Sequence, residues 1–230
     1  MAKVTWHGHA TCTLETDGGT RAVIDPFFGD NPACSVGVDE VGDVDYILVT
    51  HGHFDHFADC VPLARRTGAM VVSTFEIASF LGSEKGVENT HGMNIGGGHA
   101  FGGLGYVKLT PAVHTGSVAG DAEGAYTTDC AGFLLELDGT RFHHSGDTAL
   151  IKDMELLRGR VDVAMLPIGD NYTMGPEDAA RAVEMIGPRV VIPIHYGTWP
   201  VIEQDPEEFR RLVGDRAEVV VLEPGDSYDL

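Results

Sequence analysis

The chain has 230 residues, of which 43% are hydrophobic and 22% are charged, a balance that excludes a disordered or collagen-like chain. No apolar run approaches the ~20 residues of a membrane-spanning helix, so we expect no membrane partner. The 15 basic and 35 acidic residues give a formal net charge of −20, and a field of that sign repels phosphate backbones and disfavours nucleic-acid partners.

Strand-like segments dominate the first half of the chain. The predicted strands are Lys3–Trp6, Thr11–Glu15, Arg21–Ile24, Tyr46–Thr50 and Ala69–Ser73. Helices are predicted over Ala58–Arg66 and over Thr74–Leu81, with Gly82 ending the second. The glycine-rich segment Asn94–Gly103 fits neither a P-loop nor a dinucleotide fingerprint, and predicts a tight turn.

The second half of the chain shows a similar succession of strand-like and helical segments. Its predicted strands are Val107–Pro111, Gly132–Leu137, Thr140–His143, Val161–Leu166, Val190–Ile194 and Glu218–Leu222. One helix begins at Pro176 and is closed by Gly187, and another begins at Pro206 and ends at Gly214. Two such halves predict an α/β fold in which two mixed β-sheets pack together with helices outside. No linker divides the chain, so we expect one domain over residues 1–230.

The cysteines and the first residues of the sequence predict a cytoplasmic location for the protein. The chain enters its first strand without the apolar stretch of a secretion signal. The cysteines are scattered and include no CxxC pair, so neither a disulfide framework nor a zinc knuckle is predicted. We therefore expect reduced thiols.

One short segment carries metal-binding chemistry. His51-Gly52-His53-Phe54-Asp55-His56 places three imidazoles and a carboxylate directly after a predicted buried strand. Imidazole nitrogens bind borderline metals such as Zn²⁺, and a carboxylate adds a harder ligand. An extended chain sends His51 and His53 to the same side, while a turn into a helix directs Asp55 and His56 toward a second point. The segment can therefore serve two ions.

Three distant residues are candidates to complete the site. His114, Asp147 and His195 each follow a predicted strand. Strand ends that converge on one edge of a sheet are where α/β proteins usually form their sites. Each residue alone is a weak signal, and it is their joint pattern with the first motif that indicates a shared centre.

The order HxHxDH, His114, Asp147 and His195 resembles the metallo-β-lactamase superfamily. The segments Trp6–Ala10, Asp170–Asp178 and Ile194–Thr198 are similar to one branch of it, the bacterial and archaeal metal-dependent hydrolases of unknown substrate, which lies near the ascorbate-phosphate lactonase-like enzymes. The resemblance implies a four-layer αββα sandwich with a binuclear metal centre at one edge.

The resemblance also implies how the ligands are shared. His51, His53 and His114 would hold the first metal. Asp55, His56 and His195 would hold the second. Asp147 would bridge both, and Asp25 would support the metal loop without binding metal itself. The two divalent ions are expected to be zinc, with manganese, iron or nickel as alternatives.

Other polar residues are candidates for the surroundings of the metals. Beside Asp55 and Asp147, His9 is the third expected catalytic residue, because the branch resemblance places it next to the metal edge, where it would face the substrate or handle a proton. The alternative is that His9 only satisfies a buried carbonyl. His144 is a candidate to support a metal ligand, and Asp170 and Asn171 are candidates to line the pocket. Tyr196 and Trp199 are candidates to form its walls.

The implied reaction is hydrolysis by a metal-activated water. The expected substrate is a small molecule: an ester, a lactone or a phosphorylated metabolite. A phosphodiesterase and a metal-binding module without turnover are the alternatives, and fold alone cannot choose among substrates. The sequence leaves homo-oligomer formation open.

Overall fold

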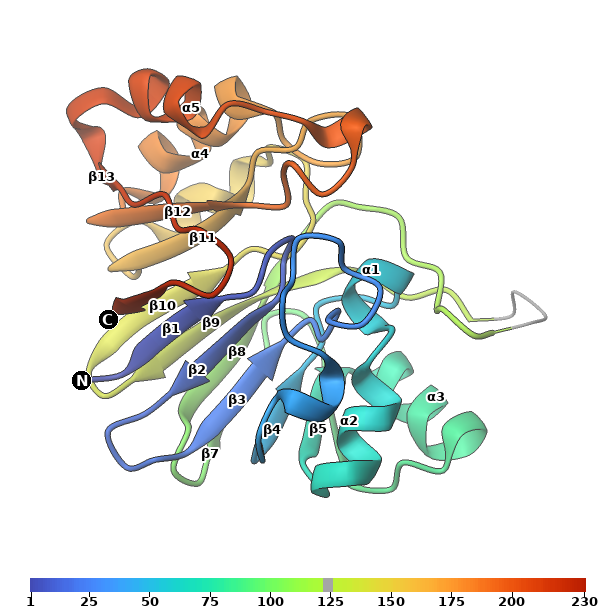
Figure 1. Cartoon of the computed structure of the whole chain (residues 1–230). Helices are drawn as coiled ribbons and strands as arrows, with labels where there is room; N and C mark the ends of the chain where they lie inside the picture. The colour runs from blue at the N-terminus through green and yellow to red at the C-terminus, as the bar shows by residue number, and fades with distance from the viewer. Residues whose placement is uncertain (122–125) are drawn as a thin grey trace.

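The computed structural model describes residues 1–121 and 126–230, and within them two β-sheets pack face to face (Figure 1). The strands of the first sheet are β1 (Lys3–Trp6), β2 (Cys12–Glu15), β3 (Arg21–Ile24), β4 (Tyr46–Leu48), β5 (Met70–Thr74), β6 (Thr90–Met93) and β14 (Ser227–Asp229). Those of the second are β7 (Gly98–Phe101), β8 (Gly105–Pro111), β9 (Ala131–Leu137), β10 (Thr140–His144), β11 (Val163–Pro167), β12 (Val190–Ile194) and β13 (Glu218–Val219).

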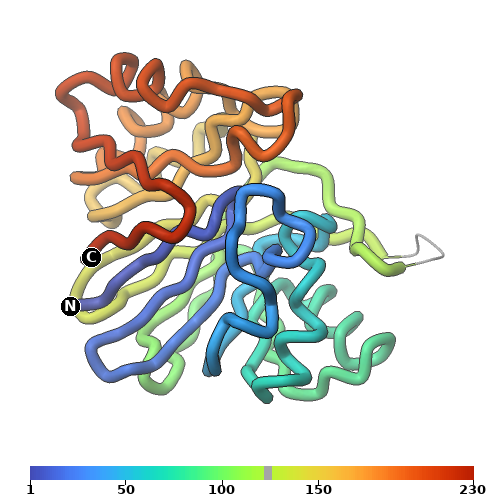
Figure 2. Tube along the Cα trace, in the orientation of Figure 1, coloured from blue at the N-terminus to red at the C-terminus, as the bar shows by residue number. Residues whose placement is uncertain are grey.

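Both sheets are mixed in the same way. The first has the order β14-β1-β2-β3-β4-β5-β6 and the second the order β13-β12-β11-β10-β9-β8-β7. Pairing is parallel from β3 to β6 and from β10 to β13, and antiparallel elsewhere. The pairing of β1 with β14 brings the two termini side by side, as Figure 2 shows.

Helices cover the outer face of each sheet (Figure 1). The first sheet carries α1 (Phe54–Phe57), α2 (Cys60–Thr67) and α3 (Phe75–Lys85), and the second carries α4 (Pro176–Ile186) and α5 (Pro206–Val213). Short 3-10 helices are η1 (Val38–Glu40), η2 (Lys152–Leu157), η3 (Pro200–Ile202) and η4 (Gly214–Arg216). The predicted four-layer αββα sandwich is therefore confirmed.

The buried hydrophobic side chains form three clusters, one between the two sheets and one between each sheet and its helices. The cluster between the sheets includes Trp6, Leu14 and Phe133. A second joins the first sheet to its helices through Ile47, and a third joins the second sheet to α4 and α5 through Phe209. Strands of the sheet centres are therefore buried on both faces, which explains their near-continuous apolar sequences.

Parallel strands direct polar residues to one edge of the sandwich. Asp25 follows β3 directly, and His51 comes three residues after β4. In the second sheet, Asp147 comes three residues after β10, and His195 follows β12 directly. The carboxyl ends of these strands therefore bring residues from both sheets together, as expected for an α/β site.

Local predictions failed at particular places. The predicted helix end at Gly82 is wrong, because α3 continues to Lys85 and ends at Gly86, which takes the left-handed conformation (φ 64°). A glycine inside a helix costs only about 1 kcal/mol, and the buried side chains of Phe80 and Leu81 hold the helix on the sheet. The glycine-rich segment forms a turn, in which the Gly97 amide donates to the Asn94 carbonyl, but it then continues into β7.

No helix among the described residues combines the length and the apolar character needed to cross a bilayer.

His143 on β10 should make folding stability depend on pH. Its Nδ1 lies 3.0 Å from the Phe133 carbonyl oxygen, and burial lowers the pKa of His143 to about 4. The unfolded side chain titrates near pH 6.5, so its contribution to stability is full above pH 6.5 and is lost as the pH falls toward 4. The loss reaches about 3 kcal/mol at pH 4.

The variant His143→Gln tests this prediction, because glutamine keeps an N–H donor for the Phe133 carbonyl but does not titrate. Urea unfolding from pH 7 to pH 4 should give a flatter stability curve for the variant than for the wild type. Parallel curves would contradict the assignment.

Candidate metal centre

The HxHxDH segment changes from extended to helical conformation within six residues. His53 is still extended (φ −62°, ψ 151°), and α1 begins at Phe54. Gly52 packs so closely on the neighbouring loop that a Cβ there would lie 2.8 Å from the Ser117 carbonyl oxygen. The change of conformation separates the two histidines before α1 from Asp55 and His56 within it.

The first group of ring nitrogens comes from His51, His53 and His114. Nδ1 of His53 lies 3.1 Å from Nε2 of His51 and 3.2 Å from Nε2 of His114. One ligand atom from each lies within 4.8 Å of the other two. The three residues that the sequence predicts for one metal are therefore brought together.

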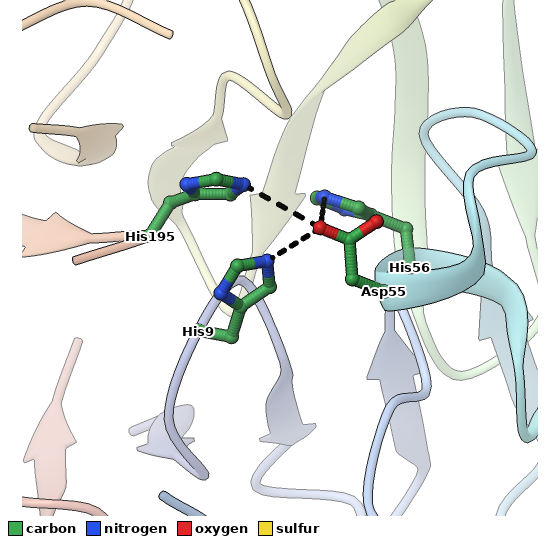
Figure 3. A group of neighbouring side chains, drawn as sticks. All are labelled: His9, Asp55, His56 and His195. Atoms are coloured by element: carbon green, nitrogen blue, oxygen red, sulfur yellow. Dashed lines mark hydrogen bonds and ion pairs between the residues drawn. The ribbon is translucent and has the colours of Figure 1, made fainter. Parts of the chain in front are cut away.

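The second group consists of His9, Asp55, His56 and His195 (Figure 3). The three rings face one carboxylate oxygen, Oδ2 of Asp55, at distances of 2.9 Å from His9 Nε2, 3.9 Å from His56 Nε2 and 3.8 Å from His195 Nε2. The predicted set of Asp55, His56 and His195 is thus assembled, with His9 added to it.

Asp147 lies between the two groups. Its Oδ2 is 3.6 Å from Nε2 of His114 in the first group and 3.0 Å from Nε2 of His195 in the second. Its Oδ1 is 3.3 Å from Nε2 of His56. This carboxylate therefore contacts both groups, which is the position that a bridging ligand requires.

Several buried polar atoms of the centre lack a hydrogen bond. They are Nε2 of His56, Nε2 of His195 and Oδ1 of Asp147. Nδ1 of His195 is also unpaired, but it lies on the other side of the ring, next to Gly169. Buried polar atoms are normally paired, so atoms that converge without bonding one another fit ligands of a cation. The combination of imidazole and carboxylate suits zinc and similar divalent metals.

The charges of the centre agree with this fit. Asp25 and Asp147 are almost fully buried, and among the described residues the ion-pair partners of Asp25, Asp55 and Asp147 are histidines alone. Burial lowers the pKa of His51 well below its usual value, which leaves a neutral imidazole of the kind that binds metal. Against the effect of burial, the carboxylates of Asp147, Asp25 and Asp55 hold the pKa of His56 well above its usual value. This concentration of negative charge favours a bound cation.

Asp25 orients two of the candidate ligands. Its Oδ1 accepts from the Thr50 amide at 2.7 Å, and its Oδ2 accepts from the Thr50 hydroxyl and from Nδ1 of His56, each at 2.7 Å. The same hydroxyl lies 3.0 Å from Nδ1 of His51. Both histidines therefore keep Nε2 for the centre, which is the arrangement of outer contacts that fixes metal-bound imidazoles.

His9 is fully buried and engaged at both ring nitrogens. Nε2 contacts Oδ2 of Asp55, and Nδ1 lies 2.8 Å from the hydroxyl of Thr198. Its carbonyl accepts from the amide of His195 at 2.9 Å. His9 and His195 both have φ 55°, and Asp25 has φ 49°, a left-handed region that costs non-glycine residues about 1–2 kcal/mol. Such strain is concentrated at functional sites.

The other candidates from the sequence lie around the centre. Nε2 of His144 lies 2.9 Å from the Ala10 carbonyl, and its Nδ1 accepts from the amide of Gly146, so His144 holds the segment before Asp147. Asp170 and Asn171 form a turn with positive φ angles. Of this turn, Tyr172 lines the pocket at the centre. The ring of Tyr196 stacks on Trp6, with 5.8 Å between the centroids.

An open pocket of about 310 Å³ borders five of the seven candidate ligands, whereas His51 and His56 are fully buried. Its lining residues are His53, Asp55, His114, Thr115, Asp147, Tyr172, His195 and Trp199. Thr50, Thr115, Tyr172 and Thr198 were missed by sequence reasoning. Tyr172 and Thr198 could have been found, because they lie within the segments Asp170–Asp178 and Ile194–Thr198 that carry the resemblance, whereas Thr50 and Thr115 belong to no motif.

The chain is similar to known proteins over most or all of its length. A family model described as "Beta-lactamase superfamily domain" matches residues 20–196. A relative from Heliobacterium modesticaldum named "UPF0173 metal-dependent hydrolase" is 48% identical over 239 residues, spanning all of this chain and 98% of the relative. A relative of the same name from Thermococcus onnurineus is 45% identical over 236 residues, covering both chains fully.

A solved structure with the same architecture is Igni18, a metallo hydrolase from the archaeon Ignicoccus hospitalis. It is 34% identical, has a TM-score of 0.87, and the match covers all of this chain and 99% of that one. An isothiocyanate hydrolase from Delia radicum gut bacteria has the same fold, with a TM-score of 0.76 at 20% identity and coverage of 99% and 98%. The chain therefore belongs to the metallo-β-lactamase superfamily and, within it, to the UPF0173 metal-dependent hydrolases.

Proposed function

We propose that this metal-dependent hydrolase uses two zinc ions to cleave a small, uncharged ester or lactone. The observation that carries the proposal is the position of Asp147, whose oxygens contact both groups of ring nitrogens next to an open pocket. His51, His53 and His114 would hold one ion, Asp55, His56 and His195 the other, and Asp147 would bridge them. Bound in this way, the ions would supply an activated water at neutral pH and polarise the attacked carbonyl.

The protein's own residues position the substrate and the ligands. Tyr172 and Trp199 give the pocket two aromatic walls, which suit an apolar or planar substrate. The Thr115 hydroxyl adds a group that can both donate and accept a hydrogen bond. Thr198 and Asp25 lie outside the pocket lining. Thr198 orients His9, and Asp25 orients His56.

The charge of the pocket favours an uncharged substrate over a phosphorylated one. Among the described lining residues there is neither a lysine nor an arginine. The zinc ions themselves would attract a phosphoryl oxygen as well as a carbonyl oxygen, but sites built for phosphate normally add such cations or backbone amides at a helix N-terminus. With a net charge of −20 on the chain, long-range attraction of an anion is also missing.

A substrate panel tests this proposal. Zinc-loaded protein should hydrolyse neutral lactones and carboxylate esters faster than phosphomonoesters and phosphodiesters of similar size. Faster cleavage of the phosphodiesters would replace the proposal with the phosphodiesterase alternative. Full metal loading without turnover of any class would favour a metal-binding module, although the open pocket beside the ligands speaks against it.

His9 should act by positioning Asp55. The variant His9→Asn tolerates the left-handed backbone but is too short to keep the contact with Asp55 Oδ2. We expect metal affinity to fall about 10–100-fold, while the pH profile of the fully loaded variant keeps its shape. The readouts are metal titration and the pH dependence of kcat.

The matched control is His7→Asn, because His7 lies in the same segment and its Nε2 contacts Thr13 rather than the centre. If His9→Asn retains its metals and loses one limb of the pH profile, His9 handles a proton instead.

A further inference from the structure

A second hollow, of about 260 Å³, lies on the outer face of the second sheet. It is bounded by β8, by β10 and by η2, and its apolar wall includes Met154, Leu156 and Leu157. It shares no lining residue with the pocket at the metal centre among the described residues. Its volume is close to that of the metal pocket, so it can admit a small molecule.

Two buried polar side chains that line this hollow have an atom without a hydrogen-bond partner among the described residues, namely the hydroxyl of Thr110 and one ring nitrogen of His143. His143 is 2% exposed and lines the hollow. Burial lowers its pKa to about 4, so the ring is neutral at physiological pH. Its Nδ1 bonds a carbonyl oxygen, which accepts only, so the proton is on Nδ1. Nε2 therefore carries a lone pair, and no described residue hydrogen-bonds it.

The rim of the hollow favours an uncharged ligand. Lys108, Arg160 and Asp153 all line the hollow, so both signs of charge are present. The ammonium of Lys108 is already engaged with the Gly96 carbonyl. A buried imidazole acceptor in an apolar recess thus selects a molecule with one N–H or O–H group and a hydrophobic body.

We propose that this hollow is a binding site for a small, uncharged, largely apolar molecule that donates one hydrogen bond to Nε2 of His143. The site lies on the far side of the segment that carries Asp147. Ser145 and Thr148 line the hollow, whereas Asp147 lines the metal pocket. The segment between β10 and η2 thus contacts both sites.

Phenol and toluene are the probes for this site, because they have similar shapes and only phenol donates a hydrogen bond. The zinc-loaded protein is labelled at the methyl groups of its seven methionines and titrated while methyl NMR shifts are followed. Met154 lines the hollow and reports binding there. Met93, at the end of β6 in the other sheet, reports non-specific effects.

We expect phenol to shift the Met154 signal saturably and to bind about three- to tenfold more tightly than toluene, the value of one hydrogen bond. The variant His143→Phe should bind both probes equally. The variant Leu157→Trp, which fills the hollow, should bind neither. The two variants alter different walls, and the comparison of the two probes in the wild type needs no variant at all.

Several outcomes would overturn the proposal. These are no saturable shift of Met154, equal shifts of Met93, equal affinities in the wild type, or a preference for phenol that survives in His143→Phe. Sedimentation of the same samples tests whether a second copy of the chain covers the exposed side chain of Leu156 instead. A dimer that excludes phenol from the Met154 signal would replace the small molecule with that interface.

Discussion

Replacing Asp147 with alanine is expected to remove at least one metal ion from the protein and to lower turnover by at least about a thousandfold. The substitution deletes both oxygens that face the two groups of ring nitrogens. It leaves His114 and His195 without the anion between them, and two cations at this spacing would repel each other without it. Elemental analysis and turnover of the best panel substrate provide the measurement.

Asp147 is almost fully buried but is not part of any of the three apolar clusters. The fold should therefore survive its replacement by alanine. Circular dichroism checks this, and Asp153→Ala, an exposed carboxylate on η2, is the matched control. Retention of both metals with full activity in Asp147→Ala would refute the bridging assignment.

The variant Asp25→Asn should weaken metal binding by about 10–100-fold, although Asp25 is not one of the proposed ligands. Its carboxylate accepts three hydrogen bonds, from the Thr50 amide, the Thr50 hydroxyl and His56 Nδ1. An asparagine offers one oxygen and turns an N–H group toward the remaining donors. We expect a loss of about 1–3 kcal/mol in the free energy of unfolding as well.

Asparagine is the informative substitution because Asp25 has φ 49°, where asparagine is tolerated and alanine is strained. The matched control is Asp138→Asn in the β9–β10 turn, whose φ is 47°. Metal titration and urea unfolding should separate the two variants. Equal metal affinity in Asp25→Asn and the wild type would show that the hydrogen bonds to His56 and His51 do not support the centre.

Much of the fold could be predicted from the sequence because its central strands are buried. The run Val190–Ile194 is short, apolar and followed by a polar residue, which indicates strand type and strand end together. The sequence predicts that the strand at Tyr46 ends at Thr50, because the apolar and β-branched pattern continues, but β4 ends at Leu48. The edge strands β6, β7 and β14 could not be predicted in this way. Their sequences are short and rich in glycine, histidine or polar residues, and they form because a neighbouring strand offers hydrogen bonds.

The candidate site also has a part that the sequence predicts and a part that it does not. Four of its residues are adjacent in the HxHxDH motif, and this local density makes the motif readable. The contact between His9 and Thr198 spans 189 positions along the chain, and no local pattern encodes it. Tertiary contacts also decide that His9 faces Asp55 and that Tyr172, rather than Asn171, reaches the pocket.

The number of metal ions bound per chain tests the proposed centre most directly. Protein loaded with zinc, dialysed mildly and analysed for metal and protein should contain two ions per chain, because two groups of ligands share Asp147. Removal of both ions by a chelator should abolish hydrolysis, and addition of zinc should restore it. One ion per chain, unchanged when more zinc is added, would contradict the binuclear centre.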